Sequence, residues 1–231
     1  MNSSPHISVM VNEVVDALAP RDGAIYVDAT FGAGGYSRAL LGAADCTVWG
    51  IDRDPLAIAI GEDLAKAHGR RLTVLSGRFG DMETLVLDGE SNLYQWEPNA
   101  ILILLHLESA NSRLVNRFTD LDSAALDSVL DGLEARVLAL ADGIAKHSGA
   151  LVLISNFQLP VRPSWGILDG RERPGQRDAI ARLNSKIAEG LARSDNAYVL
   201  DIERLTAVLG DSAANDSRNW HRSLAPWKPA L

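Results

Sequence analysis

The sequence predicts an α/β fold, a three-layer α/β/α Rossmann-like sandwich with a mainly parallel sheet in the strand order 3-2-1-4-5 and a sixth strand beyond. Short apolar runs alternate with helical patterns along the chain, which is typical of parallel sheets with crossover helices. A glycine-rich turn follows the first run. The run Ala100–Leu105 is continuously apolar, as expected for a strand covered on both faces.

The first half follows the order β-α-β-α-β after a short amphipathic helix. The predicted elements are a helix over Val9–Leu18, a strand over Ile25–Asp28, a helix from Tyr36, a strand over Thr47–Ile51, a helix over Pro55–His68 and a strand over Leu72–Leu75. Pro20 ends the first helix, Pro55 suits the first turn of its helix, and Gly69 suits a C-cap.

The second half continues the alternation with one long interruption. The predicted elements are the strand Ala100–Leu105, a helix over Asp122–His147, a strand over Leu151–Ser155, a helix over Gln176–Arg193 and a strand over Ala197–Leu200. The segment Phe157–Gly175 is a long irregular loop, and loops of that length are usually functional or mobile.

The turn Gly32-Ala-Gly34-Gly35 comes directly after a strand that ends at Asp28. Glycines let a ligand approach the backbone, and the N–H groups of the following helix face that ligand. The spacing matches neither the dinucleotide fingerprint nor a phosphate loop. Asp52 ends the next strand, where a carboxylate suits a ribose diol. A sugar without a pyrophosphate favours S-adenosylmethionine over NAD.

A purely structural interpretation is also open. The turn could be a tight strand-to-helix connection, and Asp28 and Asp52 could be helix caps. Their order and their positions at strand ends favour the ligand.

Four segments carry a family resemblance. They are His6-Ile-Ser-Val-Met-Val-Asn-Glu13-Val, Tyr26-Val-Asp-Ala-Thr-Phe-Gly-Ala-Gly-Gly-Tyr-Ser-Arg38-Ala, Gly50-Ile-Asp-Arg-Asp-Pro55 and Gly77-Arg-Phe-Gly-Asp-Met82. Together they resemble the 16S ribosomal RNA cytosine-N4 methyltransferase family called RsmH or MraW. The resemblance implies that Gly34, Gly35 and Tyr36 contact S-adenosylmethionine, Tyr36 standing where that family usually has histidine. It further implies that Asp52 holds the ribose and that Phe79 lies against the adenine.

We therefore predict a cofactor site but assign no catalytic residue and no metal ligand. The predicted cofactor-binding residues are Asp28, Gly32, Gly34, Gly35, Tyr36, Asp52 and Phe79. In the resembled family the fourth strand ends in Asp-Leu-Gly-Val-Ser-Ser, whereas this chain has Leu104-Leu-His106-Leu-Glu108-Ser109. The acidic group and the glycine of that edge are missing, as is a long insert to grip RNA. We expect cofactor binding with impaired or absent methyl transfer.

The second half has a different resemblance, to the SGNH-like N-terminal region of FkbH-like proteins. It is carried by Leu87-Asp-Gly-Glu-Ser91-Asn-Leu-Tyr94, Gly166-Ile-Leu-Asp169, Arg182-Leu-Asn184, Val199-Leu-Asp201 and Asp216-Ser-Arg-Asn-Trp220-His. Full-length FkbH-like proteins continue into a haloacid-dehalogenase-type domain that handles glyceryl transfer to a carrier protein. The resemblance therefore implies an acyl carrier protein as a partner. For an SGNH hydrolase, Gly210-Asp-Ser212 comes too late, and Asp216 and His221 are five apart instead of three.

The two resemblances meet near residue 86, so we expect one α/β domain built from residues 1–86 and 87–231. A natural fusion, a frame-altered product and an engineered recombination all stay open. In an SGNH sheet the strands at Val48 and Ile101 would be direct neighbours, whereas in a methyltransferase sheet the strand at Ile25 lies between them. The hypotheses are a methyltransferase-type cofactor binder, an SGNH-like hydrolase or carrier-protein domain, and a folded chimera without activity.

The net charge of −8 and the pI of about 5.1 do not favour strong non-specific binding to nucleic acid. RNA is therefore a possible partner that the charge does not support. The single cysteine, Cys46, fits a reducing compartment. No signal peptide is visible, and no apolar run reaches membrane length. We expect a cytoplasmic protein without a membrane segment.

Overall fold

The structure is a computed structural model, and it describes residues 11–52, 55–76, 84–172 and 174–210. Its centre is a six-stranded sheet with the order β3-β2-β1-β4-β5-β6, in which every neighbouring pair is parallel. The predicted fold class and strand order are confirmed. The strand at Ile25 lies between those at Val48 and Ile101, so the sheet has the methyltransferase order and not the SGNH order.

The strands lie close to the predicted runs. They are β1 Ile25–Asp28, β2 Thr47–Asp52, β3 Leu72–Ser76, β4 Ala100–Ile103, β5 Leu151–Ser155 and β6 Ala197–Leu200. The main helices are α1 Val11–Leu18, α2 Gly35–Ala43, α3 Pro55–His68, α8 Ser123–His147, α9 Gln176–Leu191 and α10 Ile202–Leu209. Shorter helices are α5 Asn92–Gln95, α6 Leu107–Ala110 and α7 Ser112–Asn116.

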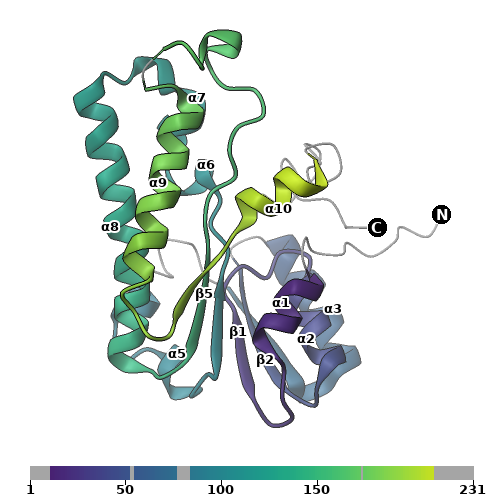
Figure 1. Cartoon of the computed structure of the whole chain (residues 1–231). Helices are drawn as coiled ribbons and strands as arrows, with labels where there is room; N and C mark the ends of the chain where they lie inside the picture. The colour runs from purple at the N-terminus through teal and green to yellow at the C-terminus, as the bar shows by residue number, and fades with distance from the viewer. Residues whose placement is uncertain (1–10, 53–54, 77–83, 173, 211–231) are drawn as a thin grey trace, which may run out of the picture.

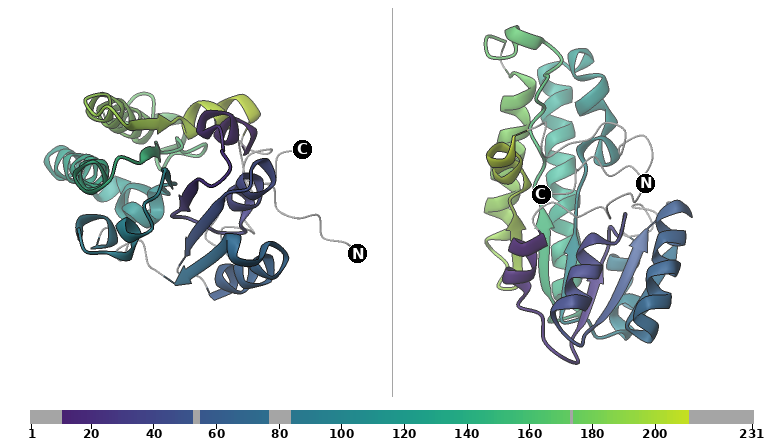
Figure 2. Two further views of the ribbon diagram at one scale, coloured as in Figure 1. Left: turned by 90° about the horizontal axis from the view of Figure 1, so that it is seen from below. Right: turned by 90° about the vertical axis from the view of Figure 1, so that its right-hand side faces the viewer.

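The helices cover the sheet in two layers (Figures 1 and 2). Helices α1, α2, α3 and α10 pack on one face, and α8 and α9 pack on the other. The upper halves of α8 and α9 extend beyond the carboxyl ends of the strands (Figure 1). None of the helices within the described ranges combines the length and hydrophobicity that a membrane crossing requires.

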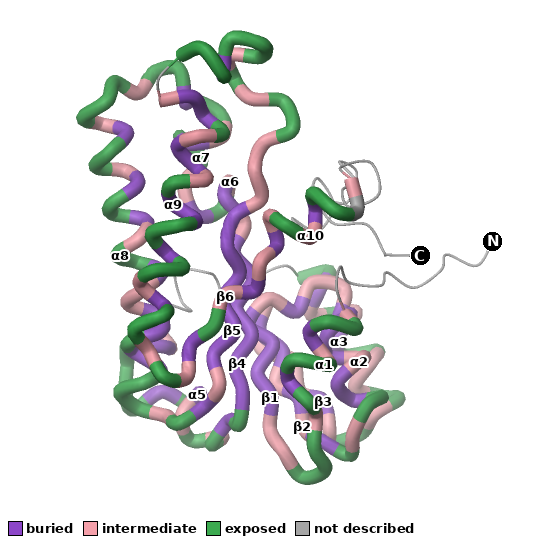
Figure 3. The backbone as a smooth tube through the Cα atoms, in the orientation of Figure 1, coloured by how far each residue is buried: buried purple, intermediate pink, exposed green. Residues whose placement is uncertain are grey.

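The side chains of β4 show how a continuously apolar run serves both layers. Successive residues of a strand point to opposite faces. Ile101 and Ile103 join the apolar cluster under α8 and α9, and Ala100 and Leu102 join the cluster under α1 and α2. The strands β1, β4 and β5 are accordingly buried along most of their length, while the outer faces of the helices are exposed (Figure 3).

The helix after residue 121 begins as predicted. The Asp122 carboxylate accepts a hydrogen bond from Ala125 N at 2.8 Å, which caps α8. The sequence did not predict α6 and α7, the two short helices that follow β4. It also placed the end of the β4 strand at Leu105, two residues beyond Ile103, where the chain leaves the ladder.

The long segment Phe157–Gly175 is irregular, as predicted, but it is anchored. The buried Gln176 side chain donates to Leu114 O at 2.7 Å and accepts from Ser164 N at 2.7 Å. The buried Asp169 carboxylate accepts from Gln176 N at 2.7 Å. Buried polar groups with several partners hold a loop in one conformation.

Candidate cofactor site

The glycine turn leaves the sheet between two strands that belong to different halves of the chain. Immediately after β1, Ala29 N donates to Leu102 O of β4 at 3.0 Å. Two residues later, Phe31 N donates to Ile51 O of β2 at 3.0 Å. The turn therefore lies at the carboxyl edge where the strand order reverses, which is where open α/β sheets bind ligands.

Two glycines of the turn adopt a backbone conformation that other residues rarely take. Gly32 has a φ of +53° and Gly34 a φ of +74°. Gly34 is also the N-cap of α2 and brings no side chain to cap it. The amino end of α2 therefore presents backbone N–H groups without a local side-chain cap, which suits a polar ligand.

The ring of Phe31 explains part of the glycine pattern without any ligand. A Cβ on Gly34 would lie 2.7 Å from Phe31 Cζ, and one on Gly50 of β2 would lie 2.4 Å from Phe31 Cδ2. Phe31 is 2% exposed. Because neither glycine has a side chain, the Phe31 ring fits between the turn and β2. The ring therefore holds the turn against β2.

Asp52 and the turn meet directly. The Oδ2 atom of Asp52, at the end of β2, accepts a hydrogen bond from Gly32 N at 2.7 Å. The two features that the sequence placed 20 residues apart thus share one edge of the sheet. The carboxylate that is predicted to hold a ribose is oriented by the backbone of the turn.

Asp28 lies behind the turn and is wholly buried. Its Oδ2 accepts from the Ser37 hydroxyl of α2 at 2.8 Å, and its Oδ1 accepts from Thr30 N at 3.3 Å. Burial raises the pKa of Asp28 to about 6, against the lowering effect of these hydrogen bonds, and the charge of Asp52 adds to the rise. Of the two interpretations open from the sequence, this geometry favours the cap.

Tyr36 and Phe79 complete the predicted set. Tyr36 is 3% exposed and lies in the apolar cluster under α1 and α2. Burial, and then the charges of Asp28 and Glu13, raise the pKa of its phenol. A cofactor contact through this side chain stays a prediction. Phe79 lies outside the described residues.

The turn also contains a polar atom that the sequence analysis did not single out. The hydroxyl oxygen of Thr30 is buried and finds no hydrogen-bond partner within the described part of the chain. A buried polar atom without a partner is costly unless a ligand or water satisfies it. This hydroxyl and the amino end of α2, whose N-cap residue Gly34 has no side chain, make the residues at the turn compatible with a polar cofactor.

The end of β4 differs chemically from the edge that the resembled family has there. Leu104 is 6% exposed and belongs to the apolar cluster under α1 and α2. Leu105 N donates to the buried hydroxyl of Ser155 at 2.7 Å. His106 follows, and burial lowers the pKa of its imidazole to about 4. The ring is therefore neutral at pH 7, and we assign it no role in a reaction.

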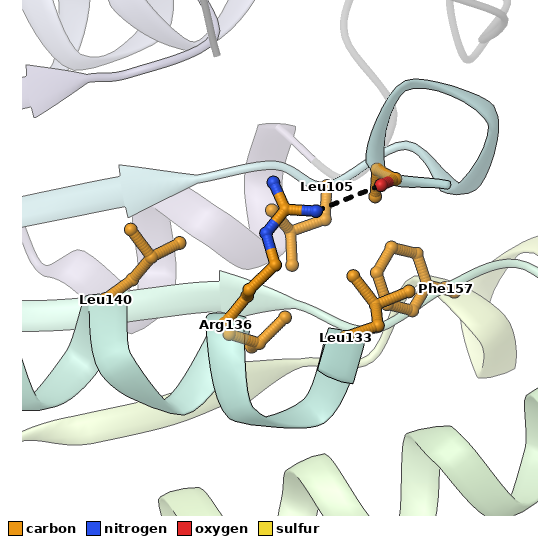
Figure 4. Close-up of a pocket in the computed structure, with 7 residues that line it drawn as sticks. Leu105, Leu133, Arg136, Leu140 and Phe157 are labelled. Atoms are coloured by element: carbon orange, nitrogen blue, oxygen red, sulfur yellow. Dashed lines mark hydrogen bonds between the residues drawn. The ribbon is translucent and has the colours of Figure 1, made fainter. Parts of the chain in front are cut away.

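Two other hollows lie away from the turn. One, of about 690 Å³, opens at the amino edge of the sheet, beside Asn99, Leu151 and Asn196. The other lies between α8 and the end of β4, where the Arg136 guanidinium donates to Ala110 O at 3.2 Å over apolar side chains (Figure 4). It leaves no room for a water molecule, so it is part of the core.

The polar residues considered for a hydrolase site lie partly outside the described part of the chain. Asp216 and His221 lie outside the described residues. The amide of Asn156 donates to Asp201 Oδ1 at 2.7 Å and accepts from Glu203 N at 3.0 Å. Asn156 therefore links the end of β5 to Asp201 after β6 and to the first turn of α10, which is the role of a strand-end cap.

Comparisons with known proteins match the first half of the chain. A model of the MraW methylase family matches residues 3–131. The ribosomal RNA small subunit methyltransferase H of Parvibaculum lavamentivorans is 61% identical over 85 residues, which is 37% of this chain and 25% of that protein. That of Rhodospirillum centenum is 66% identical over 83 residues, or 36% of this chain and 25% of that protein. The chain thus spans about a quarter of the length of these curated relatives.

One solved structure resembles the fold over most of the chain. It is the N-terminal part of the protein BF1531 from Bacteroides fragilis, containing a phosphatase domain complexed with Mg. The TM-score is 0.57 at 13% identity, and the match covers 94% of this chain and 52% of that one. At this identity the likeness shows the fold alone.

Proposed function

The chain belongs to the MraW methylase family, and from that premise we propose that its glycine turn and Asp52 bind S-adenosylmethionine. Methylases of this family depend on S-adenosylmethionine, so the cofactor predicted from the sequence is the family's cofactor. The proposal assigns this cofactor to a particular edge of the sheet.

The hydrogen bond between Asp52 and Gly32 is the observation that carries the proposal. It brings the ribose-type carboxylate and the glycine backbone together at 2.7 Å, at the switch point of the sheet. A tight turn alone would not need an acidic residue at the end of the neighbouring strand. The unsatisfied Thr30 hydroxyl adds a polar group for a ligand at the same turn.

Each group in the site has a defined task. Asp52 accepts from the ribose hydroxyls, and its bond to Gly32 keeps the carboxylate oriented before the ligand arrives. The N–H groups at the amino end of α2 and the Thr30 hydroxyl offer further polar contacts. When bound, S-adenosylmethionine supplies an electrophilic methyl group on a sulfonium.

We propose further that methyl transfer by this chain is weak or absent. The edge of β4 that carries an acidic residue in the resembled family here carries the buried Leu104, followed by a neutral His106. A carboxylate near the methyl acceptor can orient and deprotonate an amine, and leucine can do neither. Ribosomal RNA as the acceptor stays a prediction, because the net charge of −8 does not favour it.

Calorimetric titration with S-adenosylhomocysteine tests the cofactor site. We expect saturable binding by the full chain and its loss in Asp52→Ala. Asp16→Ala is the matched control, because Asp16 is an exposed carboxylate on α1. Absence of both heat and a thermal shift with the unmodified chain would contradict the proposal. Equal binding by Asp52→Ala would assign the cofactor to another place.

The other two hypotheses remain predictions with their own assays. An SGNH-like or carrier-protein function of residues 87–231 predicts turnover of p-nitrophenyl acetate or a complex with an acyl carrier protein. The hypothesis of a recombined chain without activity predicts cooperative unfolding and a negative result in all of these assays.

A further inference from the structure

The buried carboxylate of Asp28 reaches the cofactor turn from behind. It is wholly buried, and it joins the end of β1 to both the turn and α2. The Ser37 hydroxyl lies 2.8 Å from its Oδ2, and Thr30 N lies 3.3 Å from its Oδ1. The backbone N–H of Ser37 is a further group that lowers the pKa of this carboxylate. All these donors belong to the segment that carries Gly32 and Gly34.

Because Gly34 offers no side chain at the N-cap position, α2 depends on a cap from elsewhere in the sequence. Ser37 is the third residue of α2, and the third N–H of a helix is one that an N-cap side chain usually satisfies. Asp28 takes that position from the neighbouring strand. The direction of the amino end of α2 is therefore set by an acidic group on β1.

We propose that Asp28 is a positioning residue for S-adenosylmethionine: through Ser37 and Thr30 it holds the amino end of α2 and the turn in the geometry that binds the cofactor, without touching the cofactor itself. This inference rests on the proposed function. It differs from it in assigning the effect to a residue that has no access to the ligand.

The ionised carboxylate is the form that performs this task. It accepts from the Ser37 hydroxyl and from Thr30 N together. Protonation turns one carboxylate oxygen into a hydroxyl, which donates a hydrogen bond. That hydroxyl then faces groups that are themselves donors, so the cap is weakened. The charged and titratable groups around Asp28 are Asp52 on β2 and Tyr36 on α2, with Glu13 on α1 beyond Tyr36.

Cofactor affinity is then linked to the protonation of a residue remote from the ligand. We expect the affinity for S-adenosylhomocysteine to fall as the pH drops from 7.5 to 5, by about tenfold if binding shifts the pKa of Asp28 by about one unit. Asp28→Asn should bind weakly at both pH values, since the amide keeps one acceptor and adds a donor. Asp16→Asn, on an exposed side chain, should behave like the unmodified chain.

Ser37→Ala gives a second variant that leaves the carboxylate in place. It removes a hydrogen bond that lowers the pKa of Asp28, so the pH at which affinity falls should move upward. A structural weakening alone would reduce the affinity without moving this midpoint. The variant therefore separates positioning through a charged cap from general loosening, and it remains informative if Asp28→Asn does not fold.

The experiment is a calorimetric titration with S-adenosylhomocysteine at several pH values, combined with carbon-13 NMR titration of the Asp carboxyls in the ligand-free chain. Asp28→Asn binding as tightly as the unmodified chain at pH 7.5 would overturn the proposal, as would an unmoved midpoint in Ser37→Ala. No binding by the unmodified chain at any pH would instead refute the proposed function. The NMR titration would then show whether Ser37→Ala still moves the pKa of Asp28, and an unmoved pKa would overturn the cap itself.

Discussion

The carboxylate of Asp52 accepts a hydrogen bond from the backbone N–H of Gly32, with 2.7 Å between Oδ2 and N. This bond joins the end of β2 to the turn after β1, and it exists without any ligand. Two variants separate its structural part from cofactor recognition. Asp52→Asn keeps an oxygen for Gly32 N but loses the negative charge, whereas Asp52→Ala loses both.

We expect both variants to weaken binding of S-adenosylhomocysteine, and only Asp52→Ala to lower stability. The stability loss should be about 1 kcal/mol, the usual net value of one hydrogen bond. Urea unfolding measures the stability and calorimetry the affinity. Equal stability of the alanine and asparagine variants would show that the Gly32 bond adds nothing to the fold.

The packing of Phe31 against Gly50 predicts a strongly coupled pair. Gly50→Ala places a Cβ 2.4 Å from the Phe31 ring, and this overpacking should cost about 1–3 kcal/mol. Phe31→Ala removes the ring atoms that clash, so the double variant should be more stable than the two single effects predict. A double-mutant cycle by urea unfolding measures the coupling. Gly42→Ala is the control, because a Cβ there meets nothing within 4 Å. Additive effects in the cycle would contradict the packing.

Two buried groups should make the stability depend on pH in opposite directions. The pKa of Asp28 rises from 3.8 to about 6, so its contribution is full below 3.8 and is lost as the pH rises through 6. The pKa of His106 falls from 6.5 to about 4, so its contribution is full above 6.5 and is lost as the pH falls through 4. Each shift corresponds to about 3 kcal/mol.

The two trends largely cancel in the unmodified chain between pH 4 and 6.5. Relative to it, Asp28→Asn should gain stability as the pH rises through this window, and His106→Asn should lose it. Urea unfolding at intervals of half a pH unit measures both differences. If the stability of a variant and that of the unmodified chain change with pH in parallel, the substituted residue does not cause the pH dependence.

Leu104 predicts that the acidic residue of the resembled family cannot simply be restored. Leu104→Asp buries a carboxylate in an apolar cluster, which should lower the free energy of unfolding by about 3 kcal/mol or more. Leu87→Asp makes the same chemical change on a side chain that is 55% exposed and should alter stability far less. If Leu104→Asp is as stable as Leu87→Asp, the end of β4 opens to water.

The anchor of the long loop predicts a contrast between the buried Gln176 and the exposed Ile167. Gln176→Ala leaves Leu114 O and Ser164 N without their partner and should cost about 2 kcal/mol. Ile167→Ala, on a side chain that is 99% exposed, should be nearly neutral. Thermal unfolding of both variants checks this. A neutral Gln176→Ala would show that the segment does not depend on this side chain.

The sequence by itself determined the strands, their order and the composition of the turn. Each strand is an apolar run short enough to read locally, and β1 was placed between β2 and β4 by a resemblance in continuous segments. Gly32 and Gly34 were expected to let a ligand approach the backbone, and the structure adds that both have a positive φ, which only glycine takes at little cost. Asp52 was expected beside the turn because the carboxyl ends of parallel strands share one edge.

Only the tertiary structure decided what the side chains around that turn touch. In the sequence, Asp28 is an acidic residue at the end of a strand, as Asp52 is. Its burial and its hydrogen bond to Ser37 arise from the packing of α2 on the sheet. The space for Phe31 comes from Gly34 and Gly50, which lie on different elements. Such contacts join residues far apart in the chain, so no local pattern encodes them. They bury the Asp28 carboxylate behind the turn and place the Asp52 carboxylate against Gly32 N at the edge of the sheet.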